Sequence, residues 1–411
     1  MSESILVLGA QSAAAKDLLI AAREMGLIVH LATHESVWNS YPDDLRARVD
    51  HVVFTNFAAP AGAVDELVRY VRAHGISGVV TGWEFLGPMA TMTAAGAGLP
   101  GHDEAQAMDV RNKWHMANRL RSAGVPHPAT AVATSAESLL DAATAAGLEL
   151  PFVVKPSENA GSVAVSVVEE DSAVPQAYRA AGSWSHEFPH GIPLDTSVLA
   201  QQYVGGPEVS VESLVHRGRV HHLSVTAKDT TSGAIREEIG HTVPALLDEE
   251  VKTELLTTVT AALDALGITN GVAHTEVKLP PDGPPTIIEV GARPPGGYIM
   301  RVIKHAIGVD MAQLYLEVAL GREPRISASA TPQVAAIRFL TTDRIGEFQG
   351  ISGDPVDDEL FEIETYLRAG EYVGNDYETW TRIGHVIITG ADHDEVAVMA
   401  RHVDKIEIAV N

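Results

Sequence analysis

Two glutamates in the segment AHTEVKLPPDGPPTIIEVGARPPGG, residues 273–297, have the spacing of a cation site. The segment predicts a strand, a turn and a second strand. If the turn is centred on Asp282-Gly283, Glu276 and Glu289 lie opposite each other on one face. Like charges opposite each other destabilise a sheet, so something must hold them there. Two such carboxylates suit Mg²⁺. The alternative is a solvent-exposed face with screened charges.

Strand alternation assigns neighbouring side chains to the same face. In the first strand, the polar face is predicted to carry His274, Glu276 and Lys278, and the other face Ala273, Thr275, Val277 and Leu279. In the second strand, one face is predicted to carry Ile287, Glu289, Gly291 and Arg293. The arginine offers a planar fork for a carboxylate or phosphate. The histidine either orients a substrate or a carboxylate, or is structural.

A second chemical signal lies in PFVVKPSENAGSVAV, which predicts a strand, a small-residue loop and another strand. Lys155 ends the first strand, and Ser162 lies in the loop. A lysine beside a loop with exposed backbone N–H groups suits a polyphosphate. A surface lysine before a turn is the alternative.

The elements that must position these residues form three regions. Residues 1 to about 120 alternate strands and helices, which predicts a parallel sheet with right-handed crossovers. The middle of the chain predicts antiparallel strands, and a helix precedes the glutamate hairpin. The tail, from about residue 332, alternates short strands with polar turns and ends in a helix.

Composition excludes several classes of function. The 411 residues contain no cysteine, which rules out disulfides, thiolate metal sites and cysteine nucleophiles. The formal net charge of −25 argues against a nucleic-acid partner. The N-terminus predicts a strand and not a signal peptide, and no apolar run is long enough to span a membrane. We therefore expect a cytoplasmic protein.

Five segments, in their order along the chain, resemble those of the ATP-grasp superfamily, and within it the amino-acid ligases that form dipeptides. They are RNKWHMANRL, which carries a helix lysine, the Lys155 loop, QQYVGGPEVSVE, GHTVPA and IIEVGARPPGG. The resemblance covers roughly residues 1–330. It implies an α/β and α+β fold of three parts. These are an N-terminal parallel α/β domain (1–120), a small lid subdomain (121–204), and a large antiparallel-sheet catalytic domain with an α+β tail (205–411).

The resemblance also implies roles for matching residues. Lys113 and Lys155 would contact the phosphates of ATP, and Ser162 would lie in a mobile loop that closes over them. Glu276 and Glu289 would bind Mg²⁺. The hinge that meets the adenine edge would be Gln201, Gln202, Tyr203 and Val204.

Further matches concern the ribose and the reacting groups. Glu208 would hold the ribose hydroxyls, and Lys228 is placed with the nucleotide-binding residues. Arg293 would stabilise the transferred phosphoryl group and the acyl intermediate, and we place His274 with it among the catalytic residues. His241 and Lys228 match less closely than the others.

Two positions depart from the family pattern. Gly291 stands where many members carry an asparagine that ligates a metal, which leaves open whether one or two Mg²⁺ bind. Ala164 replaces a glycine of the mobile loop, so we expect a stiffer loop.

The implied activity is an ATP-dependent ligase that joins a carboxylate to an amine through an acyl phosphate and releases ADP and phosphate. Amino acids are the expected substrates, and a homodimer is a further expectation. The alternatives are an ATP-grasp enzyme with another acceptor, such as a carboxylase component or a purine-pathway ligase, and a nucleotide-binding protein without catalysis.

Overall fold

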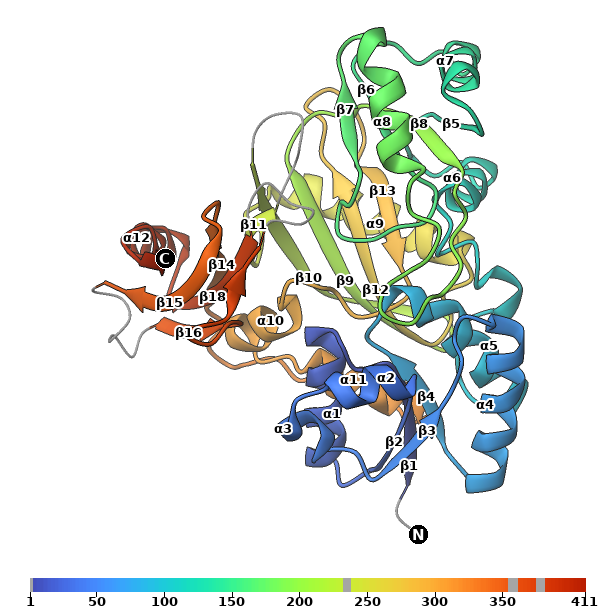
Figure 1. The fold of residues 1–411 in the computed structure, drawn as a ribbon, viewed down its shortest axis with the longest axis vertical. Coiled ribbons are helices and arrows are strands. Elements are labelled where there is room, and N and C mark those ends of the chain that lie inside the picture. Colours follow the sequence, from blue (N-terminus) through green and yellow to red (C-terminus); the bar gives the residue numbers. More distant parts are fainter. Residues whose placement is uncertain (1–2, 232–237, 354–360, 375–380) are drawn as a thin grey trace.

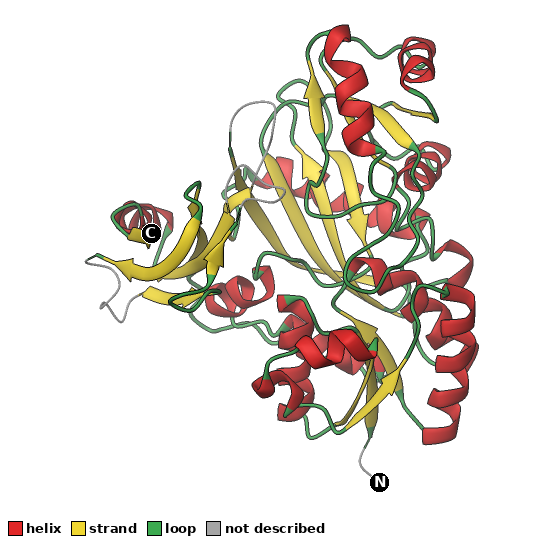
Figure 2. Ribbon diagram, viewed as in Figure 1, coloured by secondary structure: helices red, strands yellow, loops and turns green. Residues whose placement is uncertain are grey.

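The computed structural model describes residues 3–231, 238–353, 361–374 and 381–411, and its strands form four sheets (Figure 1). Helices cover the sheets and connect them (Figure 2). The first sheet is parallel and the remaining three are antiparallel, as the sequence predicts for a mixed α/β chain.

The N-terminal sheet has the strand order β3-β2-β1-β4. Its strands are β1 (Ser4–Leu8), β2 (Ile28–Thr33), β3 (His51–Phe54) and β4 (Gly78–Thr81). Its helices are α1 (Ala13–Glu24), α2 (Glu35–Ser40), α3 (Asp43–Arg46), α4 (Pro60–His74), α5 (Gly87–Ala97) and the 3₁₀ helices η1 (Glu84–Leu86) and η2 (Glu104–Gln106). Every residue of β1 and β4 is buried, as expected for parallel strands covered on both faces.

The lid is a four-stranded antiparallel sheet in the order β5-β8-β6-β7. Its strands are β5 (Thr130–Ala133), β6 (Phe152–Pro156), β7 (Ser166–Val168) and β8 (Val198–Gln202). The accompanying helices are α6 (Lys113–Ser122), α7 (Ala136–Ala145), η3 (Asp171–Ala173) and α8 (Val174–Ala181). A small core formed by α7, α8 and the strands holds this part together.

The largest sheet has eight strands in the order β13-β12-β9-β10-β11-β14-β18-β16. The strands are β9 (Glu208–His216), β10 (Arg219–Thr230), β11 (Glu238–Val243), β12 (Gly271–Lys278), β13 (Thr286–Gly291), β14 (Val334–Thr342), β16 (Phe361–Thr365) and β18 (Thr381–Gly390). The tail therefore extends the same sheet that carries the glutamate hairpin.

The remaining tail strands form the small sheet β17-β15-β19. They are β15 (Gly346–Ser352), β17 (Tyr372–Val373) and β19 (Glu407–Val410). The remaining helices are α9 (Glu249–Ala265), α10 (Ile299–Ile307), α11 (Met311–Ala319) and α12 (His393–Val403). Figure 1 shows α10 between the tail strands and the helices of the N-terminal domain.

One face of the large sheet carries an apolar core that packs against a helix. Helix α9 packs on the apolar face, where a core includes Val209, Val211, Leu255, Val259, Ala273 and Val277. Burial of this face fixes the register, because a slip of one residue would turn the polar side chains into the core.

The hairpin pairing is confirmed, with one correction. Glu276 pairs with Glu289, as the turn centre predicts. The prediction that Ile287 shares the face of Glu289 is wrong. The register shifts between Glu276 and Val277, so Ile287 pairs with Val277 and lies buried in the apolar core. A bulge of this kind lets two residues oppose one and reverses the side that the next residue faces.

Among the described residues, no helix is both long and apolar enough to cross a membrane. The proposed boundary at 120/121 falls inside α6, and the boundary at 204/205 falls between β8 and β9. The division into 1–120, 121–204 and 205–411 stays a prediction.

Candidate active site

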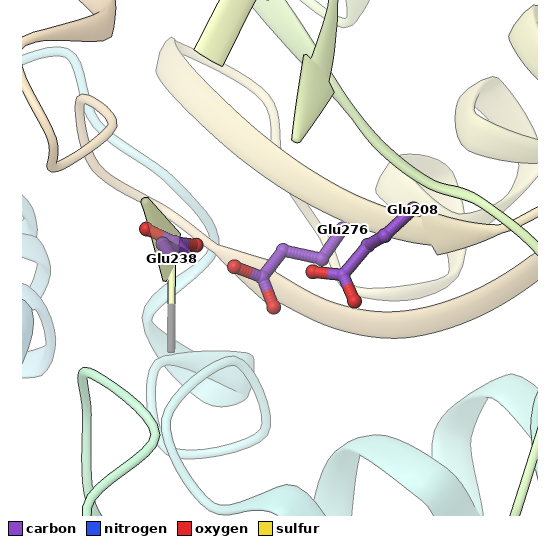
Figure 3. Close-up of side chains that lie close together, drawn as sticks. All are labelled: Glu208, Glu238 and Glu276. Carbon is purple, nitrogen blue, oxygen red and sulfur yellow. The ribbon is translucent and has the colours of Figure 1, made fainter. Parts of the chain in front are cut away.

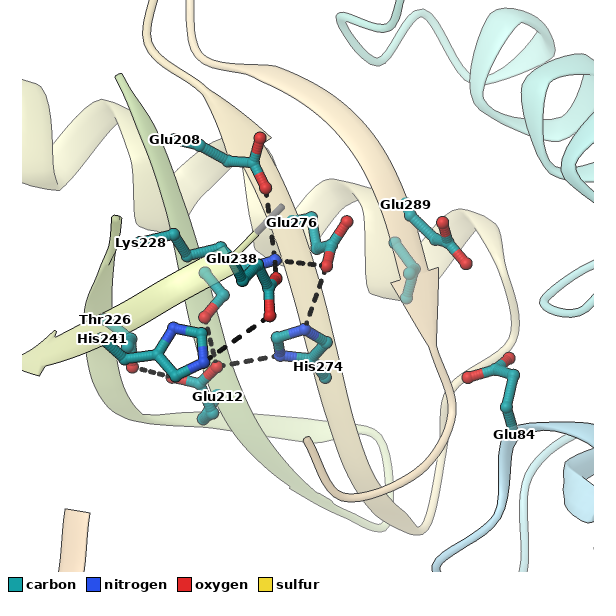
Figure 4. Close-up of polar contacts among 12 residues, drawn as sticks. Glu84, Glu208, Glu212, Thr226, Lys228, Glu238, His241, His274, Glu276 and Glu289 are labelled. Carbon is teal, nitrogen blue, oxygen red and sulfur yellow. Dashed lines mark hydrogen bonds and ion pairs between the residues drawn. The ribbon is translucent and has the colours of Figure 1, made fainter. Parts of the chain in front are cut away.

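One face of five adjacent strands, from β13 to β11, carries a continuous set of polar side chains. We call it the polar face. Its pairings align Glu276 with Glu289 and Ser210, Lys278 with Glu208, His274 with Glu212, and Lys228 with His241. The sequence-predicted metal, ribose and histidine positions therefore share one surface (Figure 4).

The two opposed glutamates are each held by a different lysine. Glu276 accepts a hydrogen bond from Lys228 Nζ at 2.5 Å, and Glu289 pairs with Lys113 Nζ at 3.0 Å. Lys113 comes from α6 and Lys228 from β10, so the two balancing charges approach from different parts of the fold. The solvent-screened alternative does not hold, because both carboxylates are paired and largely shielded.

Lys228 lies at the centre of three carboxylates. Its ammonium is 2.5 Å from Glu276, 2.6 Å from Glu238 and 3.2 Å from Glu208. One oxygen from each glutamate lies within 4.8 Å of the others, which is close enough to hold a metal ion (Figure 3). Burial alone would raise the pKa of Glu238, but Lys228 and His241 hold it at about 2.

His274 bridges two carboxylates. Its Nδ1 lies 2.9 Å from Glu212 and its Nε2 lies 3.4 Å from Glu276. Burial would lower the pKa of His274, but hydrogen bonds to both glutamates outweigh it and the pKa is raised. Glu212 is fully buried and also accepts bonds from Ser210 at 2.6 Å and Thr226 at 2.7 Å. These bonds fix the imidazole so that it faces Glu276 (Figure 4).

Arg293 is paired with Glu84, which lies just after the carboxyl end of β4 in the N-terminal domain. Another Arg293 nitrogen, Nη1, donates to the Pro294 carbonyl at 2.8 Å. Burial would raise the pKa of Glu84, but Arg293, Arg111 and Lys113 lower it. The pair therefore brings the edge of the parallel sheet to the end of the glutamate hairpin.

His241 lies beside this group in β11. Its side chain is buried, and neither ring nitrogen has a hydrogen-bond partner among the described residues. Its Nε2 lies 3.6 Å from Glu238. Burial, with the charge of Lys228, lowers the pKa of His241 to about 4, so the ring is neutral near pH 7.

Lys155 and Lys113 approach the polar face from the lid side. Lys155 is 4% exposed, and burial together with the charge of Lys113 lowers its pKa to about 8. Glu289, Glu276 and Glu208 act in the opposite direction. Lys113 also donates to the carbonyl of Asn159 at 2.7 Å, which links it to the loop that follows Lys155.

The loop that carries Ser162 has an unusual backbone. Gly161, Ser162 and Ala164 have φ angles of 67°, 59° and 59°, which lie in the left-handed region. Ala164 thus adopts the conformation that a glycine would adopt without strain. In the described part of the chain, no hydrogen bond joins the Ser162 side chain to the polar face, so the structure does not bring Ser162 into the site.

The predicted adenine hinge follows the lid sheet. The Gln201 side chain contacts the lid, where its amide donates a hydrogen bond to the Thr130 hydroxyl at 3.0 Å. Gln202 is the last residue of β8, and Tyr203 and Val204 lead toward Glu208 at the start of β9. Glu208 pairs with Lys278 at 3.1 Å. The Gln202 side chain accepts a hydrogen bond from the backbone N–H of Ala129 at 3.3 Å, so both glutamines are held by residues of the lid.

Sequence reasoning missed three carboxylates: Glu84, Glu212 and Glu238. Two had a signal. Glu212 follows Glu208 at a spacing of four in a strand, which puts both on one face. Glu84 follows a buried parallel strand, and the carboxyl ends of such strands are common ligand sites. We find no signal for Glu238 in the sequence, because its approach to Lys228 depends on how β10 and β11 pair.

Two segments match known families. Residues 148–302 match the family described as ATP-grasp domain, and residues 19–101 match the family described as ATP-grasp N-terminal domain. The first contains Lys155, the hinge and the glutamate hairpin. The second contains Glu84.

Individual proteins and structures are also similar. Alanine–anticapsin ligase from Bacillus subtilis (strain 168) is 26% identical over 270 residues, which are 62% of this chain and 56% of that protein. The match thus spans little more than half the length of this relative. A crystal structure of an L-amino acid ligase from Bacillus licheniformis has a TM-score of 0.83 and 25% identity, and covers 100% of this chain and 99% of that one.

A biotin carboxylase complex from Campylobacter jejuni also has the same fold, with a TM-score of 0.72, 18% identity, and coverage of 100% of this chain and 92% of that one. This likeness shows the fold alone. The fold is therefore common to proteins that differ in what their names say they act on.

Proposed function

Because the chain belongs to the ATP-grasp superfamily, we propose that it is an ATP-dependent ligase that joins the carboxylate of one amino acid to the amine of another. One observation carries the proposal: Lys113, Lys228 and Arg293 all pair with carboxylates around the Glu276–Glu289 hairpin. Three cations and two opposed carboxylates on one surface suit a magnesium–polyphosphate substrate.

The carboxylates have the donor chemistry that Mg²⁺ requires. Glu276 and Glu289 would hold the cation together with nucleotide phosphates, and Glu208 and Glu238 supply further oxygens beside Glu276. The ammonium of Lys228 lies among Glu208, Glu238 and Glu276, whose negative charges would also attract a metal cation. Bound Mg²⁺ would neutralise phosphate charge.

The proposed reaction begins with phosphoryl transfer. A substrate carboxylate oxygen attacks the γ-phosphorus of ATP, the bond to the β,γ-bridging oxygen breaks, and ADP leaves. An amine nitrogen then attacks the carbonyl carbon of the acyl phosphate, inorganic phosphate leaves, and the amine loses a proton. The products are an amide, ADP and phosphate.

The residues of the chain supply position and charge. Lys113 and Lys155 would neutralise the phosphates, and Arg293 would stabilise the transferred phosphoryl group and the acyl intermediate. His274 is fixed by Glu212 and would orient Glu276. The hinge at 201–204 and Glu208 would hold the adenosine part. Ser162 would join the site when its loop closes.

The choice of amino acids as substrates is supported by similar proteins. The names of the Bacillus subtilis and Bacillus licheniformis proteins describe ligases of alanine and of L-amino acids. Carboxylation with bicarbonate is the rival reaction, and it has support only from fold. A cytoplasmic location and a homodimer stay predictions from the sequence.

The experiment is a pairwise screen of amino acids for phosphate release, with product mass measured for each positive pair. We expect phosphate and a dipeptide mass in equal amounts for particular pairs, and no release with bicarbonate alone. Glu289→Gln serves as the inactive control. Release that needs bicarbonate and yields no dipeptide would replace the ligase assignment with a carboxylase.

A further inference from the structure

Tyr298 has a backbone conformation that side chains rarely adopt. It immediately precedes α10, with φ 58° and ψ 17°. Gly297 before it has φ 59°, so two consecutive residues are left-handed. The crowding of Cβ disfavours this region for any residue other than glycine. A tyrosine held there is expected to be fixed by its surroundings, and such positions concentrate at functional sites.

The turn that Tyr298 closes touches the candidate active site. A Cβ atom added to Gly297 would lie 2.5 Å from His241 Nε2, so the glycine backbone lies directly against this ring. Arg293 begins the same short segment and is followed by two prolines. Any shift of the turn would therefore change both its contact with His241 and the position of the Arg293 backbone.

The tail of the chain holds the ring of Tyr298. His385 in β18 lies 4.2 Å away between ring centroids, and Tyr366 is stacked at 5.9 Å with an angle of 16°. These two residues also contact each other, with Tyr366 Oη 3.1 Å from His385 Nδ1. His385 is completely buried, so it cannot move without repacking of its surroundings. We call Tyr366 and His385 the clamp on the Tyr298 ring.

A partly buried arginine links the same region to the N-terminal domain. Arg301 in α10 lies 4.9 Å from the ring centre of Tyr298. It pairs at 3.0 Å with Asp17 of α1 and at 3.0 Å with Glu364 of β16. Three separate parts of the chain thus meet around one tyrosine, at the helix that Figure 1 shows between them.

We propose that Tyr298 is a positioning residue, through which the tail sets the geometry of the Gly297 turn and hence of Arg293 and His241. The contacts of the Tyr298 ring with Tyr366 and His385 stabilise a left-handed backbone that a glycine would adopt without strain. This gives the tail a function in the reaction through the position of the Gly297 turn. The kinetic part of this inference rests on the proposed ligase function.

The test compares three substitutions at one position. Tyr298→Phe keeps the ring. Tyr298→Asn removes the ring but tolerates the left-handed backbone. Tyr298→Ala removes the ring and tolerates that backbone poorly. Tyr372→Ala is the matched control, because this tail tyrosine is 68% exposed and lies outside the clamp.

We expect Tyr298→Asn and Tyr298→Ala to lower kcat about 10- to 100-fold, because small displacements of reacting groups have effects of that size. KM for ATP should stay within about twofold, since the residues assigned to adenosine and to the phosphates of bound ATP, Glu208, Lys113 and Lys155, lie elsewhere, and Arg293 is assigned to the transferred group. Tyr298→Phe and Tyr372→Ala should retain wild-type kcat. Wild-type kcat in Tyr298→Asn would overturn the proposal, because the grip on the ring would then be unnecessary. A loss of melting temperature with unchanged kcat would also overturn it.

A second measurement does not depend on the reaction. NMR of the protein with labelled histidines reports the position of the turn through the ring nitrogens of His241. The His241→Gln variant assigns their resonances, because these are missing from its spectrum. The His241 resonances should shift in Tyr298→Asn and Tyr298→Ala and stay unchanged in Tyr372→Ala. Unchanged resonances in all variants would overturn the link. Wild-type protein that forms no amide would refute the ligase function, and the resonances alone would then decide the role of Tyr298.

Discussion

Glu276 and Glu289 lie directly opposite each other in adjacent strands, and each is neutralised by a lysine that approaches from a different side. Lys228 comes from β10, two strands away from Glu276 in the same sheet, whereas Lys113 comes from the helix that leads into the lid. A magnesium–nucleotide ligand would replace the lysines as partners of the glutamates, and the lysines would turn to its phosphates.

Replacement of either hairpin glutamate should abolish magnesium-dependent ATP turnover. We expect Glu276→Gln and Glu289→Gln each to lower turnover about 100-fold or more, because a fixed ligand of the phosphate-bound cation is lost. Circular dichroism should show an unchanged fold. Glu249→Gln, an exposed change in α9, is the control. Near-normal turnover in either hairpin variant would remove the metal assignment.

Lys155 should make nucleotide binding sensitive to pH. Burial and Lys113 lower its pKa to about 8, and a phosphate favours the charged form. Affinity should therefore be highest below pH 8 and fall above it, by at most about tenfold per pH unit. Calorimetry of nucleotide binding between pH 7 and 9.5 measures this. Lys155→Arg should flatten the profile, and Lys155→Ala should weaken binding at every pH. A flat wild-type profile would count against contact with phosphate.

Magnesium and nucleotide together should stabilise the fold. The gain follows RT ln(1 + [L]/Kd), about 2.7 kcal/mol at a hundredfold excess over Kd. The melting temperature should rise more with Mg-ATP than with ATP and a chelator. Arg293→Ala should keep most of this rise, measured from its own ligand-free value, while losing amide formation. An identical rise with and without Mg²⁺ would mean that the glutamates do not hold the cation.

Acid should destabilise the protein through buried histidines. The pKa is lowered to about 4 for His30, His102, His241 and His385, with burial as the largest cause. A depressed histidine pKa stabilises the fold above the unfolded value of 6.5, and this stability is lost as pH falls toward 4. Each histidine contributes a slope of at most about 1.4 kcal/mol per pH unit.

Urea unfolding at pH 7, 6, 5 and 4.5 would measure this loss. His30→Gln should flatten the slope by the share of one histidine, because its buried ring no longer has to be kept neutral. His402→Gln, an exposed change near the C-terminus, should leave the slope unchanged. Equal slopes in His30→Gln and the wild type would show that the ring does not titrate with unfolding.

Much of the site could be predicted because it depends on local periodicity. Alternation along β12 put His274 and Glu276 on one face, and the turn centre put Glu276 opposite Glu289. The bulge after Glu276 was not predictable, since alternation and a turn centre predict a pairing but not where an extra residue enters a strand. It changed the side that Ile287 faces but left the glutamate pair intact.

The remaining site residues depend on contacts between distant segments. Glu84 reaches Arg293 only because the parallel N-terminal sheet docks against the hairpin, and the two are 209 residues apart. Glu238 reaches Lys228 through strand pairing. The clamp on Tyr298 needs the tail to extend the large sheet. No repeat or spacing in the sequence encodes such distances.

The most direct test of the account follows oxygen from the amino acid to phosphate. An amino acid labelled with ¹⁸O in its carboxylate is incubated with ATP, Mg²⁺ and an accepted amine, and the released phosphate is analysed by mass spectrometry. An acyl phosphate passes one carboxylate oxygen to phosphate for each amide formed, so the account predicts one ¹⁸O per phosphate and equal amounts of ADP, phosphate and amide. Unlabelled phosphate, or AMP as the nucleotide product, would contradict it.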